Sequence, residues 1–165
     1  EQRLKDENRP FQFVERTTGL LPTLADVVLF ARTLQTLNPA PDVIVICPGL
    51  ADVQQAVGER DFARAFDVMI DAIRATGHST RIVIVAPPPS PRAPRVSRLY
   101  AEATERVARD HHVAFVDLDA LLTQGQADWV RAAYAIPESD GLYYENPAEA
   151  AQRRIADAIG KQLQR

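Results

Sequence analysis

Few residues in this chain of 165 have both a side chain and a local setting suited to catalysis. One such pair is Asp140, which precedes a glycine, and Tyr143, three residues later. A carboxylate that orients a neighbouring base is a common catalytic arrangement. A phenol, with an ordinary pKa of about 10, is however a poor general base at neutral pH. Asp140 before Gly141 is also typical of a plain turn, so the residues alone leave both interpretations open.

A second group of candidates follows the apolar run Val43–Cys47. Five apolar residues in a row, mostly β-branched, predict a strand covered on both faces, as in a parallel sheet. A proline and Gly49 end the strand sharply, and the carboxylate of Asp52 could cap the helix that follows. Ligands bind at the carboxyl ends of strands in open α/β sheets, so Gly49, Ala51 and Asp52 are candidate binding residues.

Other reactive side chains have simpler explanations. Ser90 lies on a rigid proline loop without a histidine nearby in sequence, which makes it a poor candidate for a nucleophile. Cys47, at the end of a buried strand, is interpreted as an inert small hydrophobe. His111 and His112 follow a helix end, where their charge suits the helix dipole. No ligand spacing predicts a metal site, and no glycine-rich phosphate loop predicts a nucleotide, so no cofactor is expected.

The hydrophobic pattern predicts alternating strands and helices around these candidates. Strands are expected at 11–15, 43–47, 82–86 and 113–117. Helices are expected from Thr23, after Asp61, around 96–107 and after Asn146. The apolar stripe of the first is Leu24, Val27, Val28, Ala31 and Leu34, and that of the second is Phe62, Phe66, Met69, Ile70 and Ile73. The stripe of the third is Val96, Leu99, Tyr100, Ala103 and Val107, and that of the fourth is Ala148, Ile155, Ile159 and Leu163. Right-handed crossovers then give one α/β domain over residues 1–165, with a mainly parallel sheet between helices.

Composition narrows the functional classes. Apolar residues make up 46% of the sequence and charged residues 25%, which is ordinary for a soluble globular protein. The net charge of −3 argues against a nucleic-acid partner. No apolar run is long enough to span a bilayer, and the charged stretch 1–8 shows no targeting signal. We expect a soluble protein whose compartment the sequence leaves unknown.

The order of these segments resembles the SGNH, or GDSL-type, hydrolases, which include esterases, lipases and acetylhydrolases with a three-layer αβα flavodoxin-like fold. Four segments carry the resemblance: Phe13–Gly19, Asp42–Asp52, Val83–Pro89 and Asp140–Pro147. The resemblance implies that Gly19 donates a backbone N–H to an oxyanion hole, whereas the residues alone fit a plain loop glycine equally well. It also implies that Asp140 is the family aspartate and that Asp42–Asp52 ends in the block usually written Gly-x-Asn-Asp. Pro88 is expected beside them, at the ligand-binding edge of the sheet.

The departures from the family pattern concern the residues expected to be catalytic. The block Gly-Asp-Ser that carries the family's nucleophile does not occur in this sequence. Ala51 stands where the resemblance expects an asparagine, and Tyr143 where it expects a histidine. The favoured interpretation is a binding or scaffolding module that has lost hydrolysis. The alternative is an ester hydrolase whose serine lies upstream of residue 1. A small-molecule, acyl or carbohydrate ligand is expected. The aromatic residues Trp129, Tyr134, Tyr143 and Tyr144 could stack on it or simply pack against each other.

The resemblance also implies a missing strand. In the family fold, the first strand lies between the strands expected at 11–15 and 43–47, whereas this sequence starts in what resembles the tail of the following helix. Unpaired strand edges cost free energy and invite association. We therefore expect a preceding segment or another chain to complete the sheet, and we do not expect residues 1–165 to fold alone as a well-behaved monomer.

Overall fold

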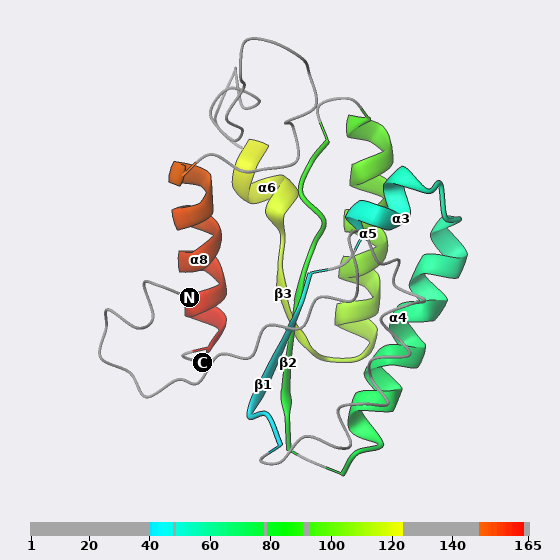
Figure 1. The fold of residues 1–165 in the computed structure, drawn as a ribbon, viewed down its shortest axis with the longest axis vertical. Coiled ribbons are helices and arrows are strands. Elements are labelled where there is room, and N and C mark those ends of the chain that lie inside the picture. The colour runs from blue at the N-terminus through cyan, green and yellow to red at the C-terminus, as the bar shows by residue number, and fades with distance from the viewer. Residues whose placement is uncertain (1–39, 48, 78, 91–92, 124–148, 164–165) are drawn as a thin grey trace.

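The computed structural model describes residues 40–47, 49–77, 79–90, 93–123 and 149–163. Along the chain the described elements are β1 (Val43–Ile46), α3 (Leu50–Gln54), α4 (Glu59–Arg74), β2 (Arg81–Val85), α5 (Pro94–Asp110), β3 (Ala114–Val116), α6 (Leu118–Thr123) and α8 (Glu149–Leu163). Within these residues, α4 and α5 lie on one side of the sheet and α8 lies on the other (Figure 1). This arrangement confirms the predicted α/β class.

The described sheet has the order β1-β2-β3, and both neighbouring pairs are parallel. Val43 pairs with Arg81 at the start of the first ladder, and Val83 pairs with Ala114 at the start of the second. Each crossover between these strands contains a long helix, first α4 and then α5. The three strands therefore end at one edge of the sheet, where α3, the loop after β2 and α6 begin.

The core between the sheet and α4 follows the periodicity of the sequence. The predicted stripe of α4 is buried throughout, at Phe62, Phe66, Met69, Ile70 and Ile73. Phe62 packs edge-on against two rings, with centroid distances of 5.5 Å to Phe66 and 4.8 Å to Tyr100. These rings join α4 to α5. Phe62 also lies next to Gly49, the N-cap residue of α3, so this core supports the start of α3.

The opposite face of the sheet is covered by α8. Val83, Val85 and Val116 are buried there with Ala151. The residues predicted as the buried face of α8 pack against this cluster but are only partly buried: Ile155, Ile159 and Leu163. The guanidinium of Arg81 donates hydrogen bonds to the carbonyls of Gln162 and Leu163, both at 3.1 Å, and so ties the end of α8 to the start of β2.

Helix α3 ends in a Schellman motif built on an alanine. The N–H of Val57 donates to the carbonyl of Asp52 at 2.9 Å, and the N–H of Ala56 donates to that of Val53 at 3.3 Å. Ala56 has a φ of 53°, in the left-handed region where glycine is the usual residue. This conformation is unfavourable for alanine, so the end of α3 requires support from surrounding contacts.

Helix α5 differs from the sequence expectation on one flank. Tyr100, Ala103 and Val107 are buried as predicted. Val96 and Leu99, predicted to be buried, are 40% and 48% exposed. The helix packs instead through a face of small side chains, Ser97, Ala101, Thr104 and Ala108. Small residues let the helix backbone approach its neighbours closely, and this orientation turns the larger Leu99 outward.

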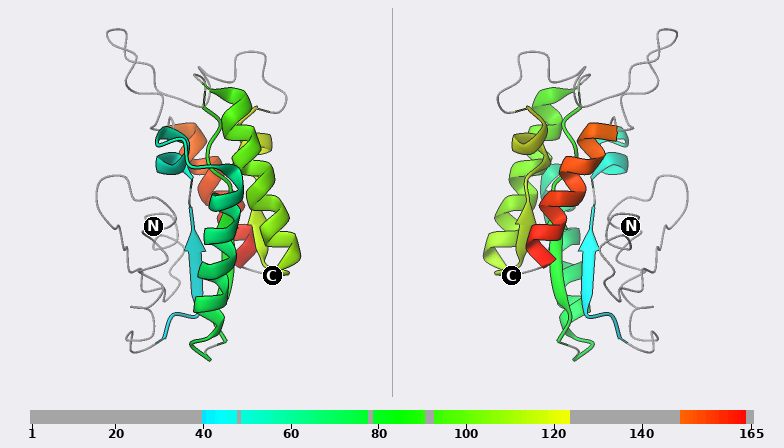
Figure 2. Two further views of the ribbon diagram at one scale, coloured as in Figure 1. Left: turned by 90° about the vertical axis from the view of Figure 1, so that its right-hand side faces the viewer. Right: turned by 90° about the vertical axis from the view of Figure 1, so that its left-hand side faces the viewer.

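Strand β1 also differs from the expectation that both its faces are covered. Val45 is 41% exposed, and Cys47, just beyond the strand, is exposed. Among the described elements, β1 is at the edge of the sheet and pairs with β2 alone. Figure 2 shows the reason in its right-hand view: α8 runs over β2 and β3, and β1 lies beside it.

Several expectations lie outside the described residues. These are the strand at 11–15, the helix from Thr23 and its stripe, Ala148 and the aromatic residues from Trp129 to Tyr144. The pairing of the 11–15 strand, and with it the expected missing strand, therefore stays a prediction. No helix among the described residues is long and apolar enough to cross a bilayer.

Candidate functional site

The turn after β1 is built on a glycine that no other residue replaces without strain. Gly49 has a φ of 104° and a ψ of −17°. A Cβ atom at this position would lie 3.0 Å from both Cβ and Cγ of Pro87, and 3.5 Å from Cζ of Phe62. Both the positive φ and the close approach of the Pro87 ring therefore favour glycine. The backbone of this turn consequently lies tightly against the loop that follows β2.

Two predicted site residues follow in α3. Ala51 is 4% exposed and Asp52 is 1% exposed. The prediction that Asp52 caps the helix is wrong: Gly49 is the N-cap residue, and no side chain caps this end. The chain turns into the helix at Gly49, earlier than expected, and so places Asp52 inside the first turn. A carboxylate there still interacts favourably with the helix dipole.

The proline loop after β2 forms the neighbouring wall. Pro87 and Pro89 are buried, and Pro88 is half-buried. The loop is held by two serines: the N–H of Ser90 donates to Oγ of Ser97 at 3.0 Å, and Ser90 Oγ accepts from the N–H of Ala93 at 3.3 Å. Ser90 therefore has a role in the loop's own structure.

Cys47 lies at the same edge, immediately after β1. The residue keeps exposed surface. The protein atoms around its sulfur nevertheless raise the pKa of the thiol to about 11, because desolvation disfavours the charged thiolate. The thiolate is the nucleophilic form of cysteine, so Cys47 is unreactive at neutral pH in spite of its position at the candidate site.

This shift predicts slow alkylation of Cys47. Because the pKa is raised from 9.0 to about 11, the thiolate fraction at pH 8 falls about 100-fold relative to an ordinary cysteine. Iodoacetamide should therefore modify Cys47 about 100-fold more slowly than it modifies free N-acetylcysteine at pH 8. The rate should continue to rise up to pH 11, as followed by mass spectrometry. Equal rates for the two thiols at pH 8 would contradict the raised pKa of Cys47.

The end of β3 carries a polar cluster that the sequence analysis did not single out. Oδ1 of Asp117 accepts from the N–H of Ala120 at 2.9 Å and so caps α6. Desolvation, followed by the charge of Asp117, raises the pKa of Asp119. The charge of Arg98 works against this rise in pKa, while its guanidinium forms an ion pair with Glu102, at 3.0 Å on the exposed side of α5. The capping aspartate was the sequence signal for α6, a helix that was not predicted.

His111 and His112, at the end of α5, lie away from this edge. His111 is the C-cap residue of α5, as its expected position at a helix end implied. Its Nε2 is 3.0 Å from Oδ1 of Asp67, and its Nδ1 is 3.3 Å from Nη1 of Arg74. These contacts join the C-terminal half of α4 to the end of α5. In the described part of the chain, no three residues of histidine, cysteine, aspartate or glutamate form a group that could hold a metal ion.

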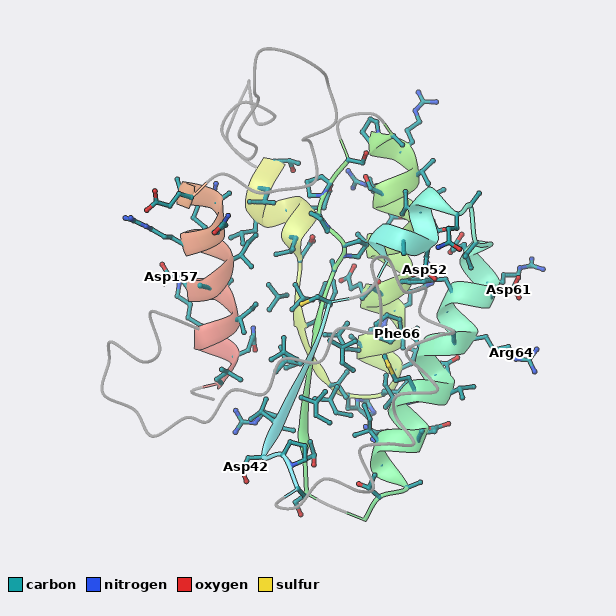
Figure 3. All side chains as sticks on the ribbon, viewed as in Figure 1. Asp42, Asp52, Asp61, Arg64, Phe66 and Asp157 are labelled. Atoms are coloured by element: carbon teal, nitrogen blue, oxygen red, sulfur yellow. The ribbon has the colours of Figure 1, made fainter. Side chains whose placement is uncertain are left out.

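Four predicted site residues thus share the carboxyl edge of β1 and β2: Gly49, Ala51, Asp52 and Pro88. Asp52 lies on α3, on the same side of the sheet as Phe66 (Figure 3). The other three predicted site residues, Gly19, Asp140 and Tyr143, lie outside the described residues. At this edge Gly49, Ala51, Asp52, Pro87 and Pro89 are buried, and Pro88 is half-buried.

Comparison with known protein families gives one match over most of the chain. The sequence model of the GDSL-like lipase/acylhydrolase family matches residues 4–135. This range contains all four of the predicted site residues that the structure describes. The comparison with curated proteins gives no match.

Solved structures give the same fold at low sequence identity. TesA is 21% identical, with a TM-score of 0.70, over 98% of this chain and 83% of TesA. The psychrotrophic esterase EstA from Pseudoalteromonas sp. is 14% identical, with a TM-score of 0.72, over 99% of this chain and 85% of EstA. The salicylyl-acyltransferase SsfX3 is 19% identical, with a TM-score of 0.64, over 83% of this chain but 40% of SsfX3.

Proposed function

Because the chain belongs to the GDSL-like lipase/acylhydrolase family, we propose that it is a non-hydrolytic member that binds an acyl-bearing small molecule. The ligand site is the carboxyl edge of β1 and β2. Ala51 is the observation that carries the proposal. It stands at the position where the family resemblance expects an asparagine, and it is buried in the first turn of α3.

An alanine at this position removes a specific catalytic contribution. A methyl group cannot donate a hydrogen bond to an oxyanion, and loss of one such donor lowers kcat by about 10²–10³. Tyr143, in place of the expected histidine, would lower the activity further, since a phenol is a poor base at neutral pH. Gly19 and Asp140 then act in binding and in turn formation respectively. Hydrolysis is therefore lost while the edge of the sheet is kept.

The lining of the edge supports an acyl ligand. The half-buried ring of Pro88 offers apolar surface at this edge, next to Pro87, which packs against the turn at Gly49; Ala51, Pro87 and Pro89 are buried. Apolar walls with a few fixed polar groups are typical of small-molecule sites. Two similar structures are an esterase and an acyltransferase by name. Their names are compatible with an acyl group as the shared chemical element.

The first test is enzymatic. The protein should hydrolyse p-nitrophenyl acetate and butyrate no faster than the buffer blank at pH 7–8, because a donor and a base are both replaced. Release of p-nitrophenolate measures the rate. The competing function is an active ester hydrolase. Saturable hydrolysis that disappears in Asp140→Asn would establish it and would refute the non-hydrolytic proposal.

The second test is binding of a probe that cannot be hydrolysed. Titration with sodium octanoate, followed by amide NMR, should shift the signals of Gly49, Ala51 and Ser90. The amides of α8 serve as the internal control, because that helix covers the other face of the sheet. Shifts confined to α8, or spread uniformly over the chain, would place the probe elsewhere and contradict the proposed site.

A further inference from the structure

A tyrosine from α5 reaches across to the turn that ends α3. Tyr100 is 4% exposed. Its hydroxyl donates a hydrogen bond to the carbonyl of Val57 and lies 3.5 Å from the carbonyl of Asp52. Asp52 and Val57 are the two residues joined by the longer hydrogen bond of the Schellman motif of α3, in which the N–H of Val57 donates to the carbonyl of Asp52. One buried hydroxyl therefore contacts both residues that close this helix end.

The ring of Tyr100 leads to the other end of the same helix. It packs against Phe62 with a centroid distance of 4.8 Å and an interplanar angle of 61°. Cζ of Phe62 lies 3.5 Å from the position that a Cβ of Gly49 would occupy. Through Phe62 the ring thus supports the N-cap of α3, and through its hydroxyl it holds the C-terminal turn.

Helix α3 depends on such support. It has five residues, so its own hydrogen bonds cannot stabilise it in isolation. Its N-cap has no side-chain hydrogen bond, and its end requires a left-handed alanine at Ala56. Burial, followed by the charges of Asp52 and Glu59, raises the pKa of Tyr100, so the hydroxyl remains a donor over the physiological range.

We infer that Tyr100 is a positioning residue that fixes α3, and with it the backbone of Gly49 and Ala51, at the ligand-binding edge of the sheet. It acts through α3 and not by touching the ligand. The inference rests on the proposed function for the identity of the ligand. The support of α3 by Tyr100 does not depend on that function. Removing the hydroxyl should loosen α3 locally and leave the rest of the core in place.

The test compares Tyr100→Phe with Thr104→Val by hydrogen exchange. Thr104 is fully buried one turn along the same helix, and its hydroxyl donates to the carbonyl of Tyr100 at 2.7 Å, so the control removes a buried hydroxyl bond that lies within α5. In Tyr100→Phe, the amides of Val53 and Val57 should exchange about 5–100-fold faster, with β2 changed less than about twofold. In Thr104→Val, the α3 amides should keep their wild-type rates.

The second readout is affinity for octanoate. Tyr100→Phe should bind the probe more weakly, whereas Thr104→Val should bind it as the wild type does. Uniformly faster exchange, or unchanged exchange in α3, would overturn the positioning role. If α3 loosens selectively while wild-type protein binds no octanoate, the proposed ligand class fails and the positioning role stands.

A measurement on the wild-type protein covers the case in which Tyr100→Phe does not fold. A hydroxyl proton held on the Val57 carbonyl exchanges slowly and gives nuclear Overhauser contacts to residues of the α3 turn. Absence of this proton signal under slow-exchange conditions would refute the inferred contact without the use of any variant.

Discussion

Replacing Phe62 by alanine should destabilise the protein by about 3–5 kcal/mol, as expected for truncation of a fully buried aromatic ring. Phe62 has no exposed surface and makes edge-on contacts with both Phe66 and Tyr100. Truncation would lose the burial of the ring, leave a cavity between α4 and α5 and remove both aromatic pairs. Urea unfolding followed by circular dichroism measures the change in the free energy of unfolding.

Val68→Ala is the matched control for this prediction. Val68 lies on the same helix but is 47% exposed. Its truncation should change the free energy of unfolding by less than about 0.5 kcal/mol. Similar values for the two variants would mean that the ring of Phe62 is not in the core between α4 and α5.

Replacing Gly49 by alanine should cost about 2–4 kcal/mol from two sources, backbone strain and overpacking. At a φ of 104°, an alanine is in a region that side chains rarely adopt. Its Cβ would also lie 3.0 Å from the ring of Pro87, which cannot rotate away. The same variant should weaken octanoate binding, since the displaced turn carries the backbone of the proposed site.

Substitutions at two other glycines distinguish the cost of backbone strain from the cost of overpacking. Gly77 has a φ of 73° but open space around it, so Gly77→Ala should show the backbone cost alone, about 1 kcal/mol. Gly160 lies inside α8 with nothing within 4 Å, so Gly160→Ala should stabilise by about 0.5–1 kcal/mol. A Gly49→Ala variant no less stable than Gly77→Ala would show that Pro87 does not restrict this turn.

The sequence predicted best those parts of the fold in which one residue pattern has one physical solution. The stripe from Phe62 to Ile73 repeats with helical period, and every member of it is buried. The apolar run at 82–86 could only be covered on both faces, and β2 is the central strand of the described sheet. The turn at Gly49 followed from a proline and a glycine after a strand.

Prediction failed where tertiary packing determines which face of a helix is buried. Helix α5 offered a larger apolar stripe through Val96 and Leu99, but it packs through small residues such as Ala101 and Ala108. Local hydrophobicity does not register how closely two backbones approach. Helix α6 was missed because six residues give too few turns for a period, and only its capping Asp117 indicated it.

The candidate site shows the same division. The position of Ala51 just after the strand β1 could be predicted from local sequence. The support from Tyr100 could not, because its hydroxyl meets a carbonyl 43 residues away along the chain, and no local pattern encodes that contact. Asp52 was assigned a capping role because its residue type suits one. The conformation of Gly49 decided otherwise.

The packing of α8 has a consequence for the order in which the protein is made. Residues 149–163 leave the ribosome after all the other described elements, and they cover Val83, Val85 and Val116. Until then, α8 does not shield this apolar strand surface from other nascent chains. Closure over so long a sequence separation is slow, and exposed strands aggregate. During synthesis, the uncovered face of the sheet therefore has to avoid association with other chains until residues 149–163 dock.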